Sequence, residues 1–545
     1  MKQLNAMIRP LAWLAPAILL WGCGATQLVS TPVENIDHVV PKVTELSEAE
    51  ARSWSHADLV RDSIPGMSVD RAYTEILGSL RGETVVVAVL DSGIDLDHED
   101  LDGVLWTNRD EKPGNGVDDD NNGYVDDVHG YNFLGESYNE QLEAARILRL
   151  NLGDAALQER ARKKLEAESA EAAANKQRYE QILQAVKNAD AAVKAHLGRD
   201  NYTKADVAGI DTQDPQLMQA VAILEQMYSF EDSIDAVMEQ LQEGIQYFTE
   251  RLNYHFNTSF NGREVVGDDP YDIDDRNYGN GNPSNRVEGE SHGTHVAGII
   301  AAERNNGIGM DGVADKVEIM AVRAVPNGDE YDKDVALAIR YAVDNGARII
   351  NASFGKPFSP NAQWVYEAIK YAAANDVLIV HAAGNDSQDL DLPENANYPT
   401  DQEGTGPEIA DNVLTVGSLD SSYGSEMVSS FSNYGRSQVD VFAPGGNIYS
   451  TMPGNAYDFQ GGTSMAAPAV AGIAAVIRSR FPDLTASQVK KIIMQSGLPV
   501  KSQVILGGNP ENARTLADAS RSGRIANLYN ALILASQVSR GNAQP

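Results

Sequence analysis

Ser464 is the first candidate for chemistry. It lies in the segment from Gly461 to Pro468 (GGTSMAAP), just before a run, Ala469 to Arg480, that is typical of a helix. At a helix N-terminus, unpaired backbone N–H groups and the helix dipole stabilise developing negative charge. Two glycines let another backbone approach, and Pro468 is expected near the first turn, where a missing N–H is tolerated. A serine there is either a nucleophile or a helix cap, the commoner role of such a residue.

Three further segments place polar residues at the ends of strands or at the start of a helix. Asp91 follows an apolar run, Thr84 to Leu90, that predicts a buried strand. His292 opens a helical segment (SHGTHVAG), and Asn385 follows another expected strand in the sequence AAGN. Ligands of open α/β sheets bind outside the carboxyl ends of the strands. These residues would therefore share one crevice with Ser464, and a nucleophile, base, carboxylate and amide donor are what acyl transfer requires.

Alternation of strands and helices is expected to position this set. Helical stretches run from Asp334 to Asn345, ended by Gly346, and from Trp364 to Asn375. Between and around them lie further short apolar runs that predict buried strands: Val317 to Val325, Ala347 to Asn351, Val377 to Ala382, Val413 to Gly417 and Val439 to Phe442. This order predicts an α/β fold with a mostly parallel central sheet and helices on its faces.

The motifs around Asp91 (DSG), His292 (HGTHVAG) and Ser464 (GTSMAAP), in this order, resemble those of the subtilisin-like serine proteases, the subtilases. The resemblance covers Trp54 to about Leu134 and Phe260 to about Ile533. It implies a three-layer subtilisin-like fold and serine endopeptidase activity. An inactive subtilase domain that serves as a binding module, and a structural lipoprotein, are the alternatives. An inactive domain usually lacks a triad residue, whereas all are present here.

By this resemblance Ser464 would attack the scissile carbonyl, His292 would accept its proton, and Asp91 would orient the imidazole. Asn385, with the backbone N–H of Ser464, would bind the oxyanion. The second histidine of the motif, His295, is expected to be structural.

The resemblance also implies where an extended peptide substrate would lie. One wall of the primary specificity pocket would be Ser353, Phe354 and Gly355, and the opposite wall Ala382, Ala383 and Gly384. The substrate strand would run near Asn327-Gly328-Asp329. Acidic side chains at Asp329, Glu330 and Asp332 either favour basic substrate residues or are only solvated.

An insertion from about Gly135 to Leu252 interrupts the alternation. Apolar residues recur there at spacings of three and four, at Tyr179, Ile182, Val186, Ala189, Val193 and Leu197, and at Ile234, Met238, Leu241, Ile245, Phe248 and Leu252. Asp214-Pro215 marks a helix start. The pattern predicts a helical hairpin over 135–252, which serves as an interaction arm, an active-site cover or a structural elaboration.

An acidic run from Asp118 to Asp127 (DDDNNGYVDD) predicts a calcium site. Asp118, Asp120 and Asn122 offer oxygens at alternate positions, Gly123 permits a sharp turn, and Asp126 lies beyond it. A solvated Asx-rich turn is the alternative. The resemblance to subtilases implies a second calcium site, with side-chain ligands from Asp100 and Asn306 and backbone carbonyls near Ile308 and Met310.

The N-terminus predicts export. Lys2 and Arg9 precede an apolar run, Leu11 to Leu20, as in a secretory signal. The following sequence LWGC, which ends in Cys23, resembles the lipobox of bacterial lipoproteins. Lipidation of Cys23 is expected, with Gly24 implying the outer membrane, facing either the periplasm or the cell surface. An ordinary cleaved signal and an uncleaved anchor are the alternatives. Cys23 is the only cysteine, which excludes an intrachain disulfide.

Composition and order complete the expected organisation. The formal net charge of −35 argues against nucleic acid as a partner, which leaves protein or peptide substrates and the lipid anchor. The expected parts are a signal peptide (1–23), a tether (24–53), a catalytic domain (54–134 and 253–536), the helical insertion (135–252) and a C-terminal tail (537–545).

Overall fold

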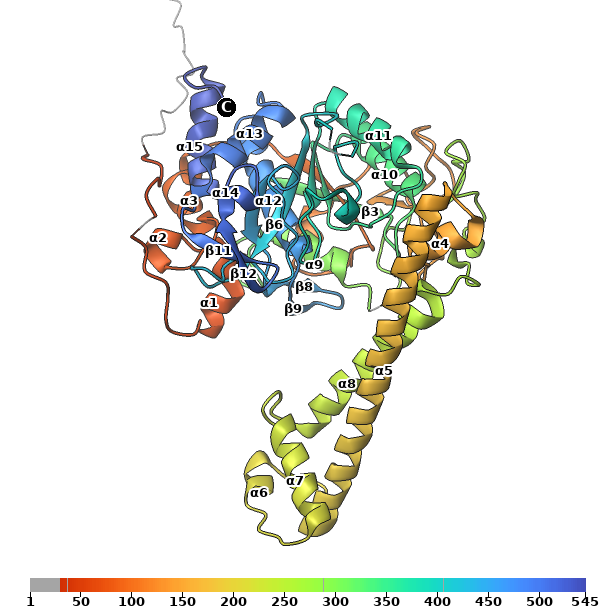
Figure 1. The fold of residues 1–545 in the computed structure, drawn as a ribbon. Helices are drawn as coiled ribbons and strands as arrows, with labels where there is room; N and C mark the ends of the chain where they lie inside the picture. The colour runs from red at the N-terminus through yellow and green to blue at the C-terminus, as the bar shows by residue number, and fades with distance from the viewer. Residues whose placement is uncertain (1–29, 37, 288, 405) are drawn as a thin grey trace, which may run out of the picture.

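A mostly parallel sheet forms the centre of the molecule (Figure 1). The computed structural model describes residues 30–545 apart from 37, 288 and 405. Within these residues nine strands form one sheet in the order β10-β13-β7-β6-β5-β4-β1-β3-β2, antiparallel only between β10 and β13. Its strands are β1 (Val85–Asp91), β2 (Gly130–Asn132), β3 (Val317–Arg323), β4 (Ile349–Ala352), β5 (Leu378–Ala382), β6 (Val413–Leu419), β7 (Val441–Pro444), β10 (Leu498–Pro499) and β13 (Arg524–Ile525). The six strands expected from the sequence are all confirmed.

Helices cover both faces of this sheet. Along β1 successive side chains point to opposite faces, so that Val87 and Val89 enter one hydrophobic cluster and Ala88 and Leu90 enter the other. The first cluster is shared with α3 (Val69–Glu75), α9 (His292–Ala301), α12 (Thr463–Arg480), α13 (Ala486–Ser496) and α15 (Leu528–Ser539). The second is shared with α10 (Asp332–Asp344) and α11 (Ala362–Ala374). The three-layer α/β fold is thereby confirmed.

Smaller elements lie around the sheet. Two hairpins pair β8 (Ile448–Met452) with β9 (Ala456–Gln460) and β11 (Gln503–Leu506) with β12 (Asn509–Thr515). Three short helices are α1 (Glu48–Ser53), α2 (Leu59–Asp62) and α14 (Leu516–Ala519). Part of the expected tether packs on the body, because Ile36 is buried and the backbone of Val33 exchanges two hydrogen bonds with the side chain of Asn530. Cys23 and the expected signal lie outside the described residues.

Pro468 lies deeper in α12 than expected. The helix begins at Thr463, so Pro468 is its sixth residue and lies inside it, and the expected position near the first turn is wrong. A proline at this place leaves the carbonyl four residues earlier, that of Ser464, without its helical donor. The hydroxyl of Ser353 donates to that carbonyl at 2.8 Å instead. Proline therefore opens a contact between α12 and the segment after β4.

The insertion is a helical arm that projects from one side of the body (Figure 1). We define the arm as residues 143–255, from α4 to the π-helical turn η4. Its helices are α4 (Glu143–Leu150), α5 (Ala155–Leu197), α6 (Lys204–Ala208), α7 (Pro215–Met227) and α8 (Ile234–Glu250), followed by η4 (Arg251–His255). The 43 residues of α5 span about 65 Å at the rise of an α-helix. In the described part of the chain, no helix is both long and apolar enough to cross a membrane.

The expected apolar seam holds the arm together. Val186, Ala189 and Val193 of α5 are buried against α7 and α8. Nearer the body, the Tyr179 and Phe248 rings lie 5.6 Å apart, edge to face. Asp214 caps α7 and Pro215 occupies its first turn, as the sequence predicts. The returning leg of the hairpin is divided into α7 and α8.

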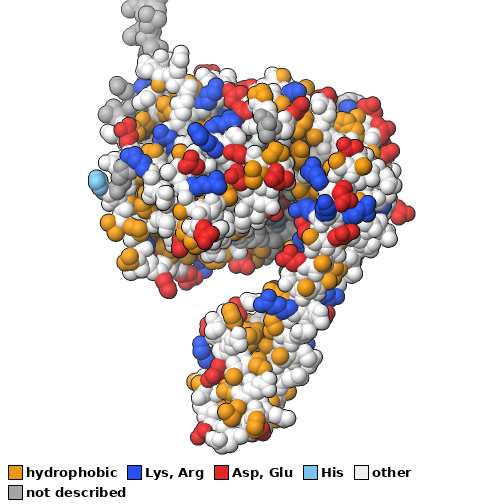
Figure 2. All heavy atoms as spheres, viewed as in Figure 1, with side chains coloured by type: hydrophobic (Ala, Val, Ile, Leu, Met, Phe, Trp, Pro, Cys, Tyr) orange, Lys and Arg blue, Asp and Glu red, His pale blue; other side chains and the backbone are white. Residues whose placement is uncertain are grey.

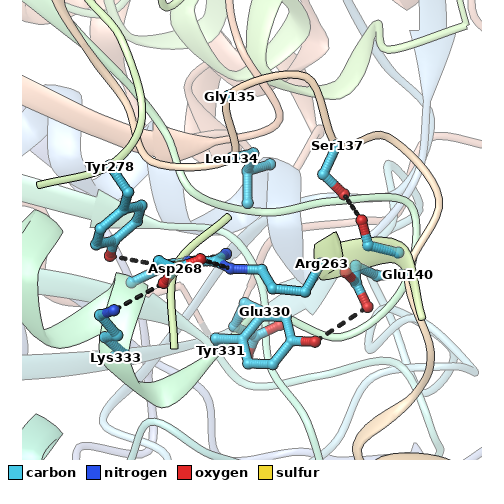
Figure 3. A network of polar contacts seen from close by, with 12 residues as sticks. Leu134, Gly135, Ser137, Glu140, Arg263, Asp268, Tyr278, Glu330, Tyr331 and Lys333 are labelled. Atoms are coloured by element: carbon cyan, nitrogen blue, oxygen red, sulfur yellow. Dashed lines mark hydrogen bonds and ion pairs between the residues drawn. The ribbon is translucent and has the colours of Figure 1, made fainter. Parts of the chain in front are cut away.

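A buried polar network lies beside the junction of arm and body (Figure 3). Arg263 forms ion pairs with Asp268 at 2.7 Å and with Asp334 at 2.5 Å. Lys333 approaches Asp268 from the other side at 2.7 Å. Burial opposes the charge of Arg263, but the two carboxylates outweigh it and raise its pKa well above the usual value. Pairing of this kind offsets part of the cost of removing these charges from water.

Candidate active site

Asp91 and His292 form the best-defined pair of the site. Asp91 ends β1 and is almost completely buried, and His292 is the first residue of α9. The imidazole Nδ1 lies 2.7 Å from Asp91 Oδ1, and the backbone N–H of Ser92 donates to the same oxygen at 2.8 Å. Because the carboxylate accepts, Nδ1 carries the proton and Nε2 is left as the base. Burial opposes protonation of His292, but the charge and hydrogen bond of Asp91 outweigh it, so the pKa of His292 lies above its usual value.

Ser464 lies in the first turn of α12 with a partly exposed side chain. Its hydroxyl donates to the backbone carbonyl of Ser353 at 3.1 Å. The hydrogen bonds of the described residues include none between Ser464 and His292. In structures without substrate such catalytic hydrogen bonds are often long or misaligned and tighten only in the complex. Rotation about the Cα–Cβ bond of Ser464 would break its hydrogen bond to the Ser353 carbonyl and point the hydroxyl in another direction.

Asn385 is held in one orientation by a residue that sequence reasoning left without a role. The side-chain Oδ1 of Asn385 accepts from the backbone N–H and from the hydroxyl of Thr463. The same hydroxyl accepts from the backbone N–H of Gly384 at 3.0 Å. With the oxygen engaged, the amide N–H groups of Asn385 remain available as donors. The only sequence signal for this role is the position of Thr463, next to Ser464.

The expected pocket walls differ in exposure. Ser353 is 3% exposed, and its hydroxyl joins the backbone of Ser464 to the side chain of Asn351, so it helps to hold the segment that carries the expected nucleophile. Phe354 is half-buried and Gly355 is exposed. On the opposite side Ala382 and Ala383 are buried and Gly384 is half-buried. A Cβ added to Gly355 would lie 2.4 Å from the side-chain oxygen of Asn397, so glycine is needed where these segments meet.

The arm's entry segment occupies one side of the expected substrate-pairing edge. The backbone N–H of Asn327 donates to Tyr138, and that of Glu140 donates back to Asn327, at 2.8 and 2.9 Å. A Cβ on Gly328 would lie 2.4 Å from the carbonyl oxygen of Glu140, which explains the glycine. The backbone N–H and C=O groups of successive residues in an extended chain point to opposite sides. A substrate strand would therefore use the other side of this segment.

The acidic residues next to this edge do not form an exposed loop. Glu330 and Asp332 are 2% and 5% exposed. Asp332 accepts from Ser359 and from the backbone N–H of Asn361, and it pairs with Lys356 at 2.9 Å. The hypothesis that these two side chains contact basic substrate residues is therefore wrong, because both are buried inside the protein.

The acidic run gathers a different set of carboxylates from the one its spacing indicated. Asp118 accepts from the backbone N–H groups of Asn122 and Gly123, and Asp126 accepts from those of Asn115 and Gly116. Three carboxylates that could hold one ion are brought together instead: Glu111, Asp120 and Asp127. The Asn122 amide donates to Asp120 and to Asp127, each at 3.1 Å. The spacing of the acidic residues in the sequence does not indicate Glu111 or Asp127 as members of this group.

This cluster fits a hard cation. Glu111 Oε2 is buried and has no hydrogen-bond partner. Burial raises the pKa of Asp127 to about 6, against the hydrogen bonds that Tyr341, Asn122 and Asn108 donate to it. Carboxylate and amide oxygens are the ligands that calcium prefers, and a cation here would offset the cost of burying these charges.

Asp100 and Asn306 also meet. The amide of Asn306 donates to Asp100 Oδ1 at 2.6 Å, and Asp100 Oδ2 accepts from the backbone of Met310 and from Tyr457, each at 3.2 Å. Asp100 is fully buried among these neutral donors. A buried carboxylate with neutral partners is a fitting ligand for a cation, and the loop that carries Ile308 and Met310 lies against it.

Comparisons with known proteins agree with this geometry. The model of the subtilase family matches residues 82–522. A thermophilic serine proteinase of Bacillus sp. (strain AK1) is 41% identical over 220 residues, 40% of this chain and 48% of that protein. Subtilisin DY of Bacillus licheniformis is 38% identical over 208 residues, 38% of this chain and 70% of that protein. Subtilisin Savinase of Lederbergia lenta is 35% identical over 234 residues, 43% of this chain and 79% of that protein.

The chain thus spans about half the length of the first of these relatives and more of the other two. The family match extends over most of the chain and includes Asp91, His292, Asn385 and Ser464. Together with the parallel sheet and the pairing of Asp91 with His292, it leads to one conclusion: this protein is a member of the subtilase family.

Proposed function

We propose that the protein is a serine endopeptidase that hydrolyses peptide bonds through Asp91, His292 and Ser464. The observation that carries the proposal is the 2.7 Å contact between His292 Nδ1 and Asp91 Oδ1. The hydrogen bonds that join Asn385 to Thr463, the residue before Ser464, support it. A buried carboxylate paired with a half-exposed imidazole has a chemical use, because it leaves Nε2 as an accessible base.

The first half-reaction forms an acyl-enzyme. Ser464 Oγ attacks the carbonyl carbon, and its proton passes to His292 Nε2. The Asn385 amide and the backbone N–H of Ser464 stabilise the oxygen anion as the carbonyl becomes tetrahedral. His292 then donates its proton to the leaving amine as the peptide C–N bond breaks. Asp91 stabilises the imidazolium throughout and is not itself protonated.

The second half-reaction regenerates the enzyme. His292 takes a proton from water, whose oxygen attacks the ester carbonyl, and Asn385 again stabilises the anion. Collapse of this intermediate releases the new carboxyl group, and His292 returns the proton to Ser464 Oγ. Each residue thus ends in its starting state.

A fluorophosphonate probe tests the assignment. It should label the wild-type protein and not the Ser464→Ala variant, and the wild type should cleave casein. Ser464→Ala should retain the wild-type circular dichroism spectrum. A folded wild-type protein that is neither labelled nor active would favour the binding-module alternative.

Calcium is proposed as a stabilising ligand. Glu111, Asp120 and Asp127 would hold one ion beside Asn122, and Asp100 would hold another together with Asn306 and nearby backbone carbonyls. The unpartnered Glu111 Oε2 and the neutral surroundings of Asp100 support this proposal. The ions would fix surface loops and take no part in proton transfer.

We also propose export and anchoring through a lipid on Cys23, which the signal-like N-terminal sequence supports. The enzyme would then act on proteins or peptides at the outer membrane, and nucleic acid is not an expected partner given the net charge of −35.

A further inference from the structure

A cleft of about 660 Å³ lies between the arm and the body. On the body side it is lined by Asp329, Gly355 and Asn397, so it begins at the expected primary pocket and follows the expected path of the substrate. Its lining includes neither Ser464 nor His292. Because it reaches both Gly355, at the expected primary pocket, and Asp329, in the segment expected to pair with the substrate, an extended peptide bound there would place side chains along it.

The arm gives this cleft a basic wall. The arm's charged lining residues are Arg160, Lys163, Lys164, Arg251 and Glu168. Four positive charges and one negative charge make this wall +3, in a chain whose net charge is −35. Figure 2 shows blue Lys and Arg side chains gathered, together with red acidic ones, where the arm leaves the body.

Arg160 is the member of this wall that is available to a ligand. Glu168 is engaged by Lys164 at 2.8 Å and by Arg251 at 3.5 Å, and Lys163 lies 3.6 Å from Glu159. Among the described residues, no carboxylate forms an ion pair with Arg160. Its guanidinium lies 5.4 Å from the centre of the Phe358 ring, and Phe358 is 4% exposed and lines the same cleft. An aromatic ring under a guanidinium holds it in place without neutralising its charge.

The body side of the cleft carries negatively charged side chains. Asp329, Asp386 and Glu394 lie on the body side of the cleft. Asp329 accepts from the backbone N–H of Glu143 at 2.7 Å, whereas Asp386 and Glu394 are exposed. An acidic side chain in the primary pocket would meet these carboxylates, but one that points to the arm would meet Arg160.

We propose that the base of the arm is a substrate-specificity subsite, in which Arg160 pairs with an acidic side chain of the peptide N-terminal to the residue in the primary pocket. The inference rests on the proposed peptidase function and assigns the arm a part in it. The preference is confined to positions that face the arm and is absent at the residue in the primary pocket.

Cleavage profiling of a peptide library tests the proposal with the full-length protein. Wild type should prefer Asp or Glu over Gln at one or more positions preceding the primary-pocket residue. The ratio of kcat/KM for a matched Glu and Gln peptide pair should fall roughly twofold to fivefold in Arg160→Gln, the range of an exposed ion pair. Arg160→Glu should reverse the preference toward Lys. The effect should shrink as salt is raised.

Arg162→Glu is the matched control. Arg162 lies on the same helix with its side chain 52% exposed and does not line the cleft, so its profile should equal that of wild type. A wild-type enzyme that cleaves but shows no acidic preference at these positions, or a preference that Arg160→Glu leaves unchanged, would overturn the subsite. A wild-type protein that cleaves no peptide would instead overturn the peptidase function itself.

Discussion

The side-chain oxygen of Asn385 accepts hydrogen bonds from both the backbone N–H and the hydroxyl of Thr463, at 2.9 and 3.0 Å. This contact joins the residue before Ser464, the proposed nucleophile, to the proposed oxyanion donor. It fixes the orientation of the Asn385 amide, because the oxygen is held by Thr463 and the N–H groups are left as donors. This orientation matters because an amide oxygen cannot stabilise an anion.

Thr463→Val should lower kcat with little change in KM, because the Asn385 donor matters most when the oxyanion forms. The backbone N–H of Thr463 still holds Asn385, so the loss should be roughly threefold to tenfold, the value of one hydrogen bond. Asn385→Ala should lose roughly 10²- to 10³-fold. Steady-state kinetics on one peptide measures both.

Thr463→Ser is the control, because it keeps the hydroxyl. Its kcat should remain close to the wild-type value. If serine and valine at this position lose activity equally, the hydroxyl does not position Asn385.

Asp91→Asn should change both the rate and its pH dependence. His292 acts as a base only when neutral, so kcat/KM should rise as the pH passes upward through its raised pKa. Without the negative charge, burial dominates and the pKa of His292 falls, which moves this limb to lower pH. The rate should fall by roughly four orders of magnitude, because the imidazole tautomer is no longer fixed. A pH profile of kcat/KM for both enzymes checks the shift.

The same interaction makes the stability of the fold depend on pH. A folded-state pKa above the unfolded value means that the Asp91–His292 pair stabilises the fold fully below the unfolded pKa of histidine and loses this contribution as the pH rises through the folded pKa. Active enzyme therefore forgoes part of this stabilisation. An acid limb that is identical in wild type and Asp91→Asn would contradict the assigned cause.

Much of this site could be predicted from the sequence, because its residues lie at the ends of regular elements. The apolar run before Asp91 and the helix that carries Ser464 have patterns that can be recognised in the local sequence alone. The placement of Pro468 could not be predicted in the same way. Pro468 leaves the Ser464 carbonyl without its helical donor, and Ser353 replaces that donor. Ser353 is distant in sequence and reaches this carbonyl only in the folded chain.

The acidic run shows a second limit. Alternation along Asp118 to Asp127 identifies residues able to bind a cation but not the direction of each side chain. Asp126 turns toward the backbone of Asn115 and Gly116, and Glu111 reaches the cluster from outside the run. Similarly, the sequence indicates Glu330 and Asp332 as loop acids, but both are buried in the folded chain, where Lys356 pairs with Asp332.

Lys356→Met should destabilise the junction between arm and body. Lys356 is 2% exposed and contacts Glu143 of the arm at 2.7 Å and Asp332 of the body at 2.9 Å. Burial alone would lower the pKa of Lys356, but these carboxylates raise it above the usual value. Removing the cation leaves buried carboxylates short of a partner, at a cost of about 3 kcal/mol in the free energy of unfolding. Urea denaturation measures this loss.

A double variant, Lys356→Met with Glu143→Met, tests the cause. It removes the arm carboxylate together with the cation and should recover part of the lost stability, because an apolar pair can replace a buried ion pair. If the double variant is as unstable as the sum of the two single variants, the two charges do not interact.

Cys23→Ala should release the protein from membranes. If Cys23 carries the proposed lipid, wild type should sediment with the outer-membrane fraction and appear in the detergent phase after Triton X-114 partition. The variant should be found in the aqueous phase. Metabolic labelling with an alkyne fatty acid should mark the wild type alone, and equal partition of the two proteins would contradict lipidation.

Removal of calcium should lower the thermal stability of the protein, because a ligand that binds only the folded state stabilises it by mass action. Glu111→Gln separates the two proposed sites. It removes one of the three clustered carboxylates and leaves Asp100 and Asn306 intact, so the difference in Tm between calcium and EDTA should shrink without disappearing. Asp100→Asn should have the complementary effect, and the double variant should respond to neither. Differential scanning calorimetry on each protein measures these differences in Tm.

Glu264→Gln, at an exposed position outside both sites, is the control and should keep the full wild-type difference. An equal Tm for wild type in calcium and in EDTA would exclude both ions as stabilising ligands.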